Sequence, residues 1–185
     1  MMRPVLLTLC LWWAFGCTMT PQKPDASQYR RLGDSIATLT QQALLKNVVQ
    51  AVTDSGFSYA IRYCNVHAVA LTSALAGTGQ VLSIQRLSDK NRNPDNRITE
   101  AADQSAFAYL QSGGADTLIF REGEAVYYKS IKIMMPTCLK CHGSDADLDA
   151  SVAEVLKEKY PGDLARNYRM GDLRGMWKIV MKTES

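Results

Sequence analysis

The stretch Cys138-Leu139-Lys140-Cys141-His142, followed by Gly143, decides most about this chain. Two cysteines separated by two residues and followed by a histidine form the attachment pattern of a c-type haem. Each thiol adds to one haem vinyl group, and the histidine is placed under the iron as its proximal ligand. The stretch therefore predicts one covalently bound haem, held by Cys138 and Cys141, with His142 on the iron.

Zinc binding and dithiol chemistry are the alternatives for this stretch. A Cys-x-x-Cys pair also occurs in redox disulfides and in zinc sites. A structural zinc site closes with four ligands, yet outside the N-terminal segment only Cys64 and His67 could add to the motif. Haem is therefore the favoured interpretation.

The N-terminal segment predicts export. Arg3 precedes an apolar run over 5–15, which is too short to span a bilayer and is typical of a signal peptide. Small residues before Cys17 resemble the lipobox of bacterial lipoproteins, in which that cysteine is acylated and becomes the mature N-terminus. We expect a signal peptide over 1–16 and a lipid anchor on Cys17, with a cleaved soluble signal or an uncleaved anchor as alternatives.

This resemblance also predicts a location. A lipoprotein of this kind belongs to the cell envelope, faces the periplasm and contacts the membrane through its lipid. Thr18 follows the cysteine where inner-membrane lipoproteins carry aspartate, which favours the outer membrane over the inner one.

Composition predicts one globular domain behind a tether. The chain has 185 residues, of which 46% are hydrophobic and 21% charged. Residues 17–28 include a run of Pro, Gln, Ser and Thr and are expected to form a flexible tether, which leaves 29–185 for the domain. A formal net charge of +3, with no basic run interleaved with aromatics, excludes nucleic acid as an expected partner.

Hydrophobic periodicity predicts helices first and then strands with helical insertions. Apolar residues recur at helical spacing over 29–52 and, after a break at 54–56, again over 61–75. The later predicted elements are strands over 81–87, 117–121, 126–133 and 175–181, and helices over 98–110 and 148–160. This order favours an α+β domain with an antiparallel sheet. A coiled-coil homodimer is the alternative use of the first helix.

The second axial ligand stays open on residue chemistry alone. The candidates are His67, Cys64, Met134, Met135 and Met170. Imidazole is the commoner partner of the iron, but helical spacing places Cys64 on the buried stripe and His67 on its border. The choice matters because methionine raises the reduction potential, whereas an anionic thiolate lowers it.

Several ordered motifs together resemble a known family. They are the lone cysteine on the second helix, Asn91-Arg92-Asn93-Pro94, Pro136 to Gly143, Tyr160-Pro161-Gly162-Asp163, and Tyr168 to Gly175. They resemble the exported single-haem c-type domain with a PAS-like fold, found as stand-alone haem proteins and as a sensor region of bacterial histidine kinases. The resemblance spans 29–181. It implies a PAS-like antiparallel sheet with long N-terminal helices, and an iron held by His142 and Cys64.

The same motifs favour two arginines as partners of the haem propionates. Buried carboxylates need cationic or hydrogen-bonding partners, for which Arg86, Arg92, Arg97 and Arg174 are candidates. Arg92 and Arg174 are favoured because they lie inside the family motifs. The chain departs from the family at Asn167, where members often have glycine, and at Asp95, which interrupts the usual run after the proline.

The sequence thus predicts an exported, lipid-anchored haem protein that transfers electrons at low potential or responds to redox state, with an unidentified redox partner. The alternative is a haem-based redox or gas sensor that acts through a separate signalling protein. An enzyme is not favoured, because two axial ligands leave no open position on the iron.

Overall fold

The computed structural model describes residues 24–184, so the predicted signal peptide over 1–16 and the predicted lipidation site Cys17 lie outside it. The first helix, α1, runs from Ala26 to Ser73. Its N-cap is Asp25, whose carboxylate accepts a hydrogen bond from the Ser27 amide at 2.9 Å. The helix therefore begins within the last residues of the predicted tether, three residues before Tyr29.

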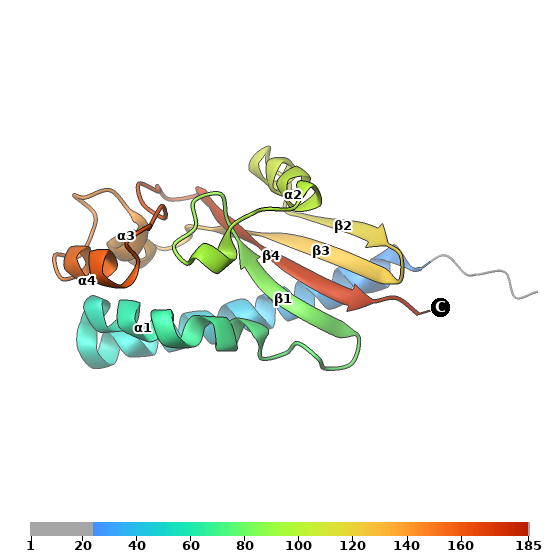
Figure 1. The fold of residues 1–185 in the computed structure, drawn as a ribbon, viewed down its shortest axis with the longest axis horizontal. Coiled ribbons are helices and arrows are strands. Elements are labelled where there is room, and N and C mark those ends of the chain that lie inside the picture. Colours follow the sequence, from blue (N-terminus) through green and yellow to red (C-terminus); the bar gives the residue numbers. More distant parts are fainter. Residues whose placement is uncertain (1–23, 185) are drawn as a thin grey trace, which may run out of the picture.

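Helix α1 is folded back on itself at Gly56. This glycine has φ 81° and ψ 179°, a left-handed conformation that ends one helical half and starts another. The two halves run antiparallel, as the turning ribbon in Figure 1 shows, and the Tyr63 hydroxyl lies 3.0 Å from Asn47 Oδ1 across them. The predicted break between two long helices is confirmed, and we call this element the α1 hairpin.

The sheet is antiparallel throughout, with the strand order β1-β4-β3-β2. Its strands are β1 (Val81–Leu87), β2 (Asp116–Arg121), β3 (Glu124–Lys132) and β4 (Leu173–Lys182). All four lie where the sequence predicts strands. The PAS-like α+β class, with long N-terminal helices and an antiparallel sheet, is confirmed.

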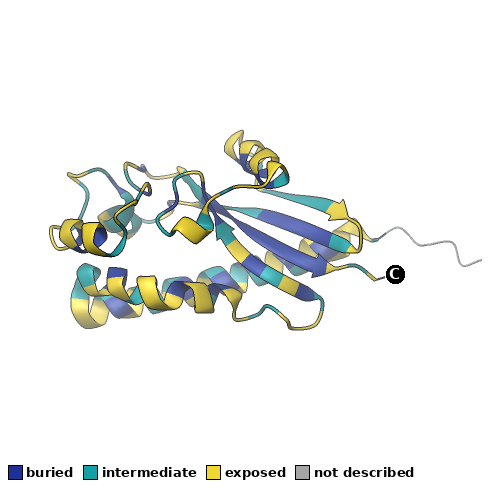
Figure 2. Ribbon diagram, viewed as in Figure 1, coloured by how far each residue is buried: buried dark blue, intermediate teal, exposed yellow. Residues whose placement is uncertain are grey.

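Alternation along the central strands separates two cores. Tyr127 and Trp177 point to the α1 hairpin, whereas Tyr128 and Val180 point to α2 (Ala101–Gln111) on the other face. Figure 2 shows the two central strands as the most continuously buried part of the molecule. The sheet is thus covered by helices on both faces.

The remaining elements form a lobe beyond one end of the sheet. They are the short 3₁₀ helix η1 (Pro94–Asn96), α3 (Pro136–His142) and α4 (Val152–Lys159). Helix α4 packs its buried side chains Val152, Val155 and Leu156 against Ile61 of the hairpin. This contact places α3 opposite the hairpin (Figure 1). Within residues 24–184, no helix is long and apolar enough to cross a bilayer.

Candidate functional site

A cavity of about 500 Å³ lies between the α1 hairpin and the lobe that carries α3. This volume is within the usual range of cofactor and ligand sites. Its apolar wall comes mainly from the hairpin and consists of Leu44, Leu45, Val48, Val49, Val52, Phe57, Ala60, Ile61 and Ala68. The opposite wall comes from α3, from the ends of β1, β3 and β4, and from the neighbouring loops with η1.

The haem-attachment motif is helical, and all three of its functional side chains line this cavity. Cys138, Cys141 and His142 follow one another at i, i+3 and i+4, which places them on one face of α3. Pro136 occupies the first turn, where its missing amide proton costs no helical hydrogen bond. The motif therefore places two thiols and an imidazole at the same cavity.

His142 is oriented through its other ring nitrogen. Nδ1 lies 3.0 Å from the carbonyl oxygen of Ala165, and because a carbonyl only accepts, Nδ1 must donate. This bond leaves Nε2 with a free lone pair, as a metal ligand requires. Burial, followed by the charges of Arg174 and Arg92, holds the pKa of His142 well below its usual range. The imidazole is therefore neutral and ready to coordinate.

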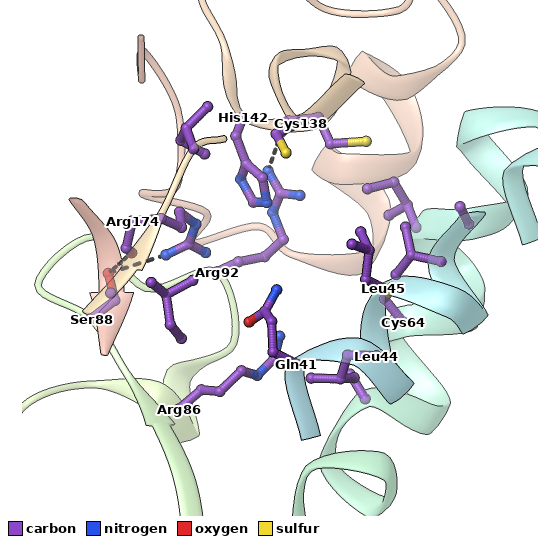
Figure 3. Close-up of a pocket in the computed structure, with 18 of the residues that line it drawn as sticks. Gln41, Leu44, Leu45, Cys64, Arg86, Ser88, Arg92, Cys138, His142 and Arg174 are labelled. Carbon is purple, nitrogen blue, oxygen red and sulfur yellow. Dashed lines mark hydrogen bonds between the residues drawn. The ribbon is translucent and has the colours of Figure 1, made fainter. Parts of the chain in front are cut away.

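Cys64 lines the same cavity from the second half of the α1 hairpin (Figure 3). Burial raises the pKa of its thiol, and the charges of Arg86 and Arg92 only partly oppose this effect. Burial also raises the pKa of the Cys141 thiol to about 11. Cys64, Cys138 and Cys141 are all free of disulfides. The raised pKa values keep the thiols of Cys64 and Cys141 protonated near neutral pH.

The other candidate iron ligands differ in whether they line the cavity. His67 is exposed, stacks on Tyr63 with ring centroids 4.5 Å apart, and does not line the cavity. Met134 and Met170 are 68% and 47% exposed, whereas Met135 lines the cavity. The fold thus brings Cys64 and Met135 to the site and leaves His67 outside it.

Arg92 reaches the cavity but is already engaged by protein groups. Its Nε and Nη2 atoms each lie 3.1 Å from a carboxylate oxygen of Asp163, in a buried, two-pronged ion pair. Nη2 also lies 2.6 Å from the carbonyl oxygen of Cys141. Arg92 therefore ties the motif helix to the loop after α4.

Arg174 and Arg86 have cationic groups that the protein leaves without a carboxylate. Arg174 Nη1 bonds Ser88 Oγ at 3.1 Å and the Lys90 carbonyl oxygen at 3.3 Å. The Nε atoms of both arginines are buried without a partner, and no ion pair of the described residues includes either one. Burial lowers the pKa of each guanidinium. Arg97 is exposed and lies outside the cavity lining.

Two residues matter more in the structure than sequence reasoning indicated: Arg86 was a candidate propionate partner but not a favoured one, and Asp163 had no assigned role. Arg86 pairs with Trp177 across β1 and β4, which puts its side chain on the hairpin face of the sheet. Strand alternation from Ile84 could have indicated that face. Asp163 lies inside a recognised motif, but its pairing with Arg92 is a contact between distant segments that no local pattern reveals.

The site combines an apolar wall, two thiols and an imidazole on one helix, a third thiol opposite, and two unpaired cations. Within the described residues, no three His, Cys, Asp or Glu side chains are grouped closely enough to hold a metal ion by themselves. The arrangement therefore fits a large apolar ligand that carries its own metal and anionic groups better than it fits a zinc site.

Comparisons with known proteins agree with the fold. The structure is similar to the crystal structure of the cyanobacterial heme-protein Tll0287, with a TM-score of 0.59 and 18% sequence identity; the match covers 87% of this chain and 99% of that one. No curated protein sequence matches the chain. A sequence model of the Tll0287-like family matches residues 23–181, which confirms the resemblance inferred from the motifs. The chain belongs to the Tll0287-like family.

Proposed function

We propose that this chain binds one haem covalently through Cys138 and Cys141, with His142 and Cys64 as the two axial ligands of the iron. The observation that carries the proposal is that Cys64, from the α1 hairpin, and the motif on α3 line one cavity. Membership of the Tll0287-like family and the likeness to a heme-protein support the same cofactor.

The protein groups have distinct tasks in this proposal. The two thiols on α3 would hold the haem covalently through its vinyl groups, so that the cofactor is retained. His142 would bind the iron through Nε2 while Nδ1 remains on the Ala165 carbonyl, and Cys64 would bind as a thiolate, without its proton. Arg86 and Arg174 offer their free donors to the propionates. The haem supplies reversible one-electron exchange.

Ligation by a thiolate leads to the proposed role, which is electron transfer at low potential or a response to redox state. An anionic sulfur stabilises ferric iron and lowers the reduction potential. We further propose that the protein is exported and anchored to the envelope by a lipid on Cys17.

The second candidate is a haem-based redox or gas sensor with a separate signalling partner. The property that favours it is the burial of Cys64, which raises the pKa of its thiol. Because burial favours the protonated thiol, Cys64 would leave the iron most readily after reduction, when ferrous iron holds the anionic sulfur less strongly than ferric iron does. Rapid carbon monoxide binding to the reduced protein would support sensing over simple electron transfer.

Mass and absorption spectra of the exported protein test the haem proposal, with Cys64→Ala as the variant and His67→Ala as its matched control on the same helical half. We expect wild type and both variants to carry the mass of one haem. Cys64→Ala should change the ferric spectrum and raise the potential, because the anionic ligand is lost, while His67→Ala leaves both unchanged. A Cys64→Ala spectrum identical to wild type would refute the ligand assignment.

A further inference from the structure

The Asp163 carboxylate organises the loop that faces His142. Asp163 and Arg92 are among the most enclosed charged groups of the chain, with side chains 8% and 10% exposed. Besides Arg92, the carboxylate accepts the backbone amide of Ala165 at 2.9 Å from the same Oδ1 that accepts Arg92 Nε. Asp163 therefore fixes both the arginine and the position of Ala165.

The carbonyl oxygen of Ala165 receives two donors. His142 Nδ1 lies 3.0 Å from this oxygen and Arg92 Nη2 lies 3.3 Å from it. Ala165 itself is completely buried, so water does not compete for the oxygen. A cation thus shares the acceptor that orients the imidazole.

We propose that Arg92 and Asp163 form a positioning pair that sets the reduction potential of the metal that His142 binds, both by their charges and through the Ala165 carbonyl that orients the imidazole. The inference rests on the haem proposal above. It gives Arg92 a role that differs from that of Arg86 and Arg174, because Asp163 already occupies two of its donor atoms.

Two effects of Arg92 act in the same direction. Its positive charge near the site disfavours the more positive, oxidised iron. Its hydrogen bond also draws electron density from the Ala165 oxygen, so His142 donates a weaker bond to that oxygen and is a less basic ligand. Arg92 therefore raises the potential, and the negative charge of Asp163 moderates this increase.

Because Arg92 and Asp163 carry opposite charges, removing each charge should shift the reduction potential in opposite directions. Loosening of the loop alone would not produce opposite shifts. Arg92→Met removes the cation and should lower the potential, whereas Asp163→Asn leaves the cation uncompensated and should raise it. We expect each change to alter the ratio of oxidised to reduced protein about tenfold at a fixed potential, equal to about 59 mV for a one-electron couple.

The experiment is a redox titration of the exported haem protein and its variants, followed by absorption. Arg92→Lys keeps the charge and should shift the potential less than Arg92→Met does. The double variant Arg92→Met/Asp163→Asn restores the net charge and should lie closer to wild type than either single variant. Arg97→Met, which removes an exposed arginine outside the cavity, should leave the potential unchanged.

The outcomes separate this inference from the function on which it rests. Wild-type protein that lacks the mass of one haem overturns the haem proposal and this inference with it. Haem-bearing variants with unchanged potentials, or with both single variants shifted in the same direction, overturn the inference alone. Opposite shifts with compensation in the double variant establish it.

Discussion

At the scale of residues, the distinctive feature is a pair of arginines that face the cavity without acidic partners. A buried cation without a counter-charge costs free energy, and a protein keeps one most readily where a ligand supplies the missing anion. Arg86 and Arg174 both fit this description, since their buried Nε atoms lack partners. In the proposed complex the two propionates would complete the charge balance.

Arg86→Met should have opposite effects on the haem-free and haem-bearing proteins. Without haem, removal of an unpaired cation should leave the free energy of unfolding unchanged or raise it by about 1 kcal/mol. With haem, the same change should lower it, because a propionate loses its partner. Urea denaturation of both forms measures these values, with Arg97→Met as the control. Equal destabilisation of both forms would show that the protein itself satisfies Arg86.

At this scale, sequence reasoning indicated which residues could line the site better than it indicated which contacts they make. Helical periodicity placed Cys64 on the buried stripe with Ile61 and Ala68, both of which are buried, and the family resemblance then favoured it as an iron ligand. Sequence reasoning favoured Arg92 over Arg86 as a propionate partner, because no local pattern reveals the ion pair that engages Arg92: it involves Asp163, which approaches Arg92 only after folding. Asn167, where family members often have glycine, has a left-handed backbone with φ 62°, which asparagine tolerates better than most residues.

At the scale of elements, the site depends on how closely the α1 hairpin approaches the sheet. Gly33 is buried against the ring of Tyr127 on β3, and a Cβ atom at position 33 would lie 2.4 Å from Tyr127 Cγ. No side chain larger than hydrogen fits there. The absence of a side chain thus sets the distance between the helix and the strand.

Gly33→Ala should destabilise the protein by about 2 kcal/mol. Alanine gains up to about 1 kcal/mol in helix propensity, but the steric overlap with Tyr127 costs more than this gain. Thermal or urea unfolding measures the difference. Gly162→Ala is the control, because a Cβ atom at that position meets no heavy atom within 4 Å. A stabilised Gly33→Ala variant would mean that the ring moves aside at little cost.

The predicted elements were most accurate where the pattern was local. The hairpin break, the strands and α2 all occur, although α2 begins at Ala101 and not at Ile98. Helix α4 begins at Val152, later than the apolar spacing from Leu148 indicated. The reason is side-chain bonding before the helix, where the Ser151 amide donates to Asp149 Oδ1 at 2.9 Å and so favours a turn.

At the scale of the whole molecule, the proposed function requires the domain to reach the compartment where c-type haem is attached. The prediction depends on Cys17, which lies outside the described residues. Its replacement with serine should release the exported protein from the membrane fraction if, as proposed, an acylated Cys17 is the anchor.

Detergent phase partition measures this release. Wild type and the Cys64→Ala variant should enter the detergent phase, and Cys17→Ser should remain in the aqueous phase. Wild-type protein found in the aqueous phase would refute lipid anchoring, while the haem assignment would be unaffected.

The helical motif on α3 has a consequence for the order of assembly. Cys138, Cys141 and His142 lie within five consecutive residues, so haem attachment requires only a short peptide. Cys64 reaches the same cavity only after the hairpin has folded back at Gly56 and packed on the sheet. In the proposed complex, covalent attachment would therefore show only that the cofactor had been delivered. Coordination by the Cys64 sulfur would show that the chain had folded. A chain that cannot close its hairpin would still be a coloured protein, but with an iron that lacks its second ligand.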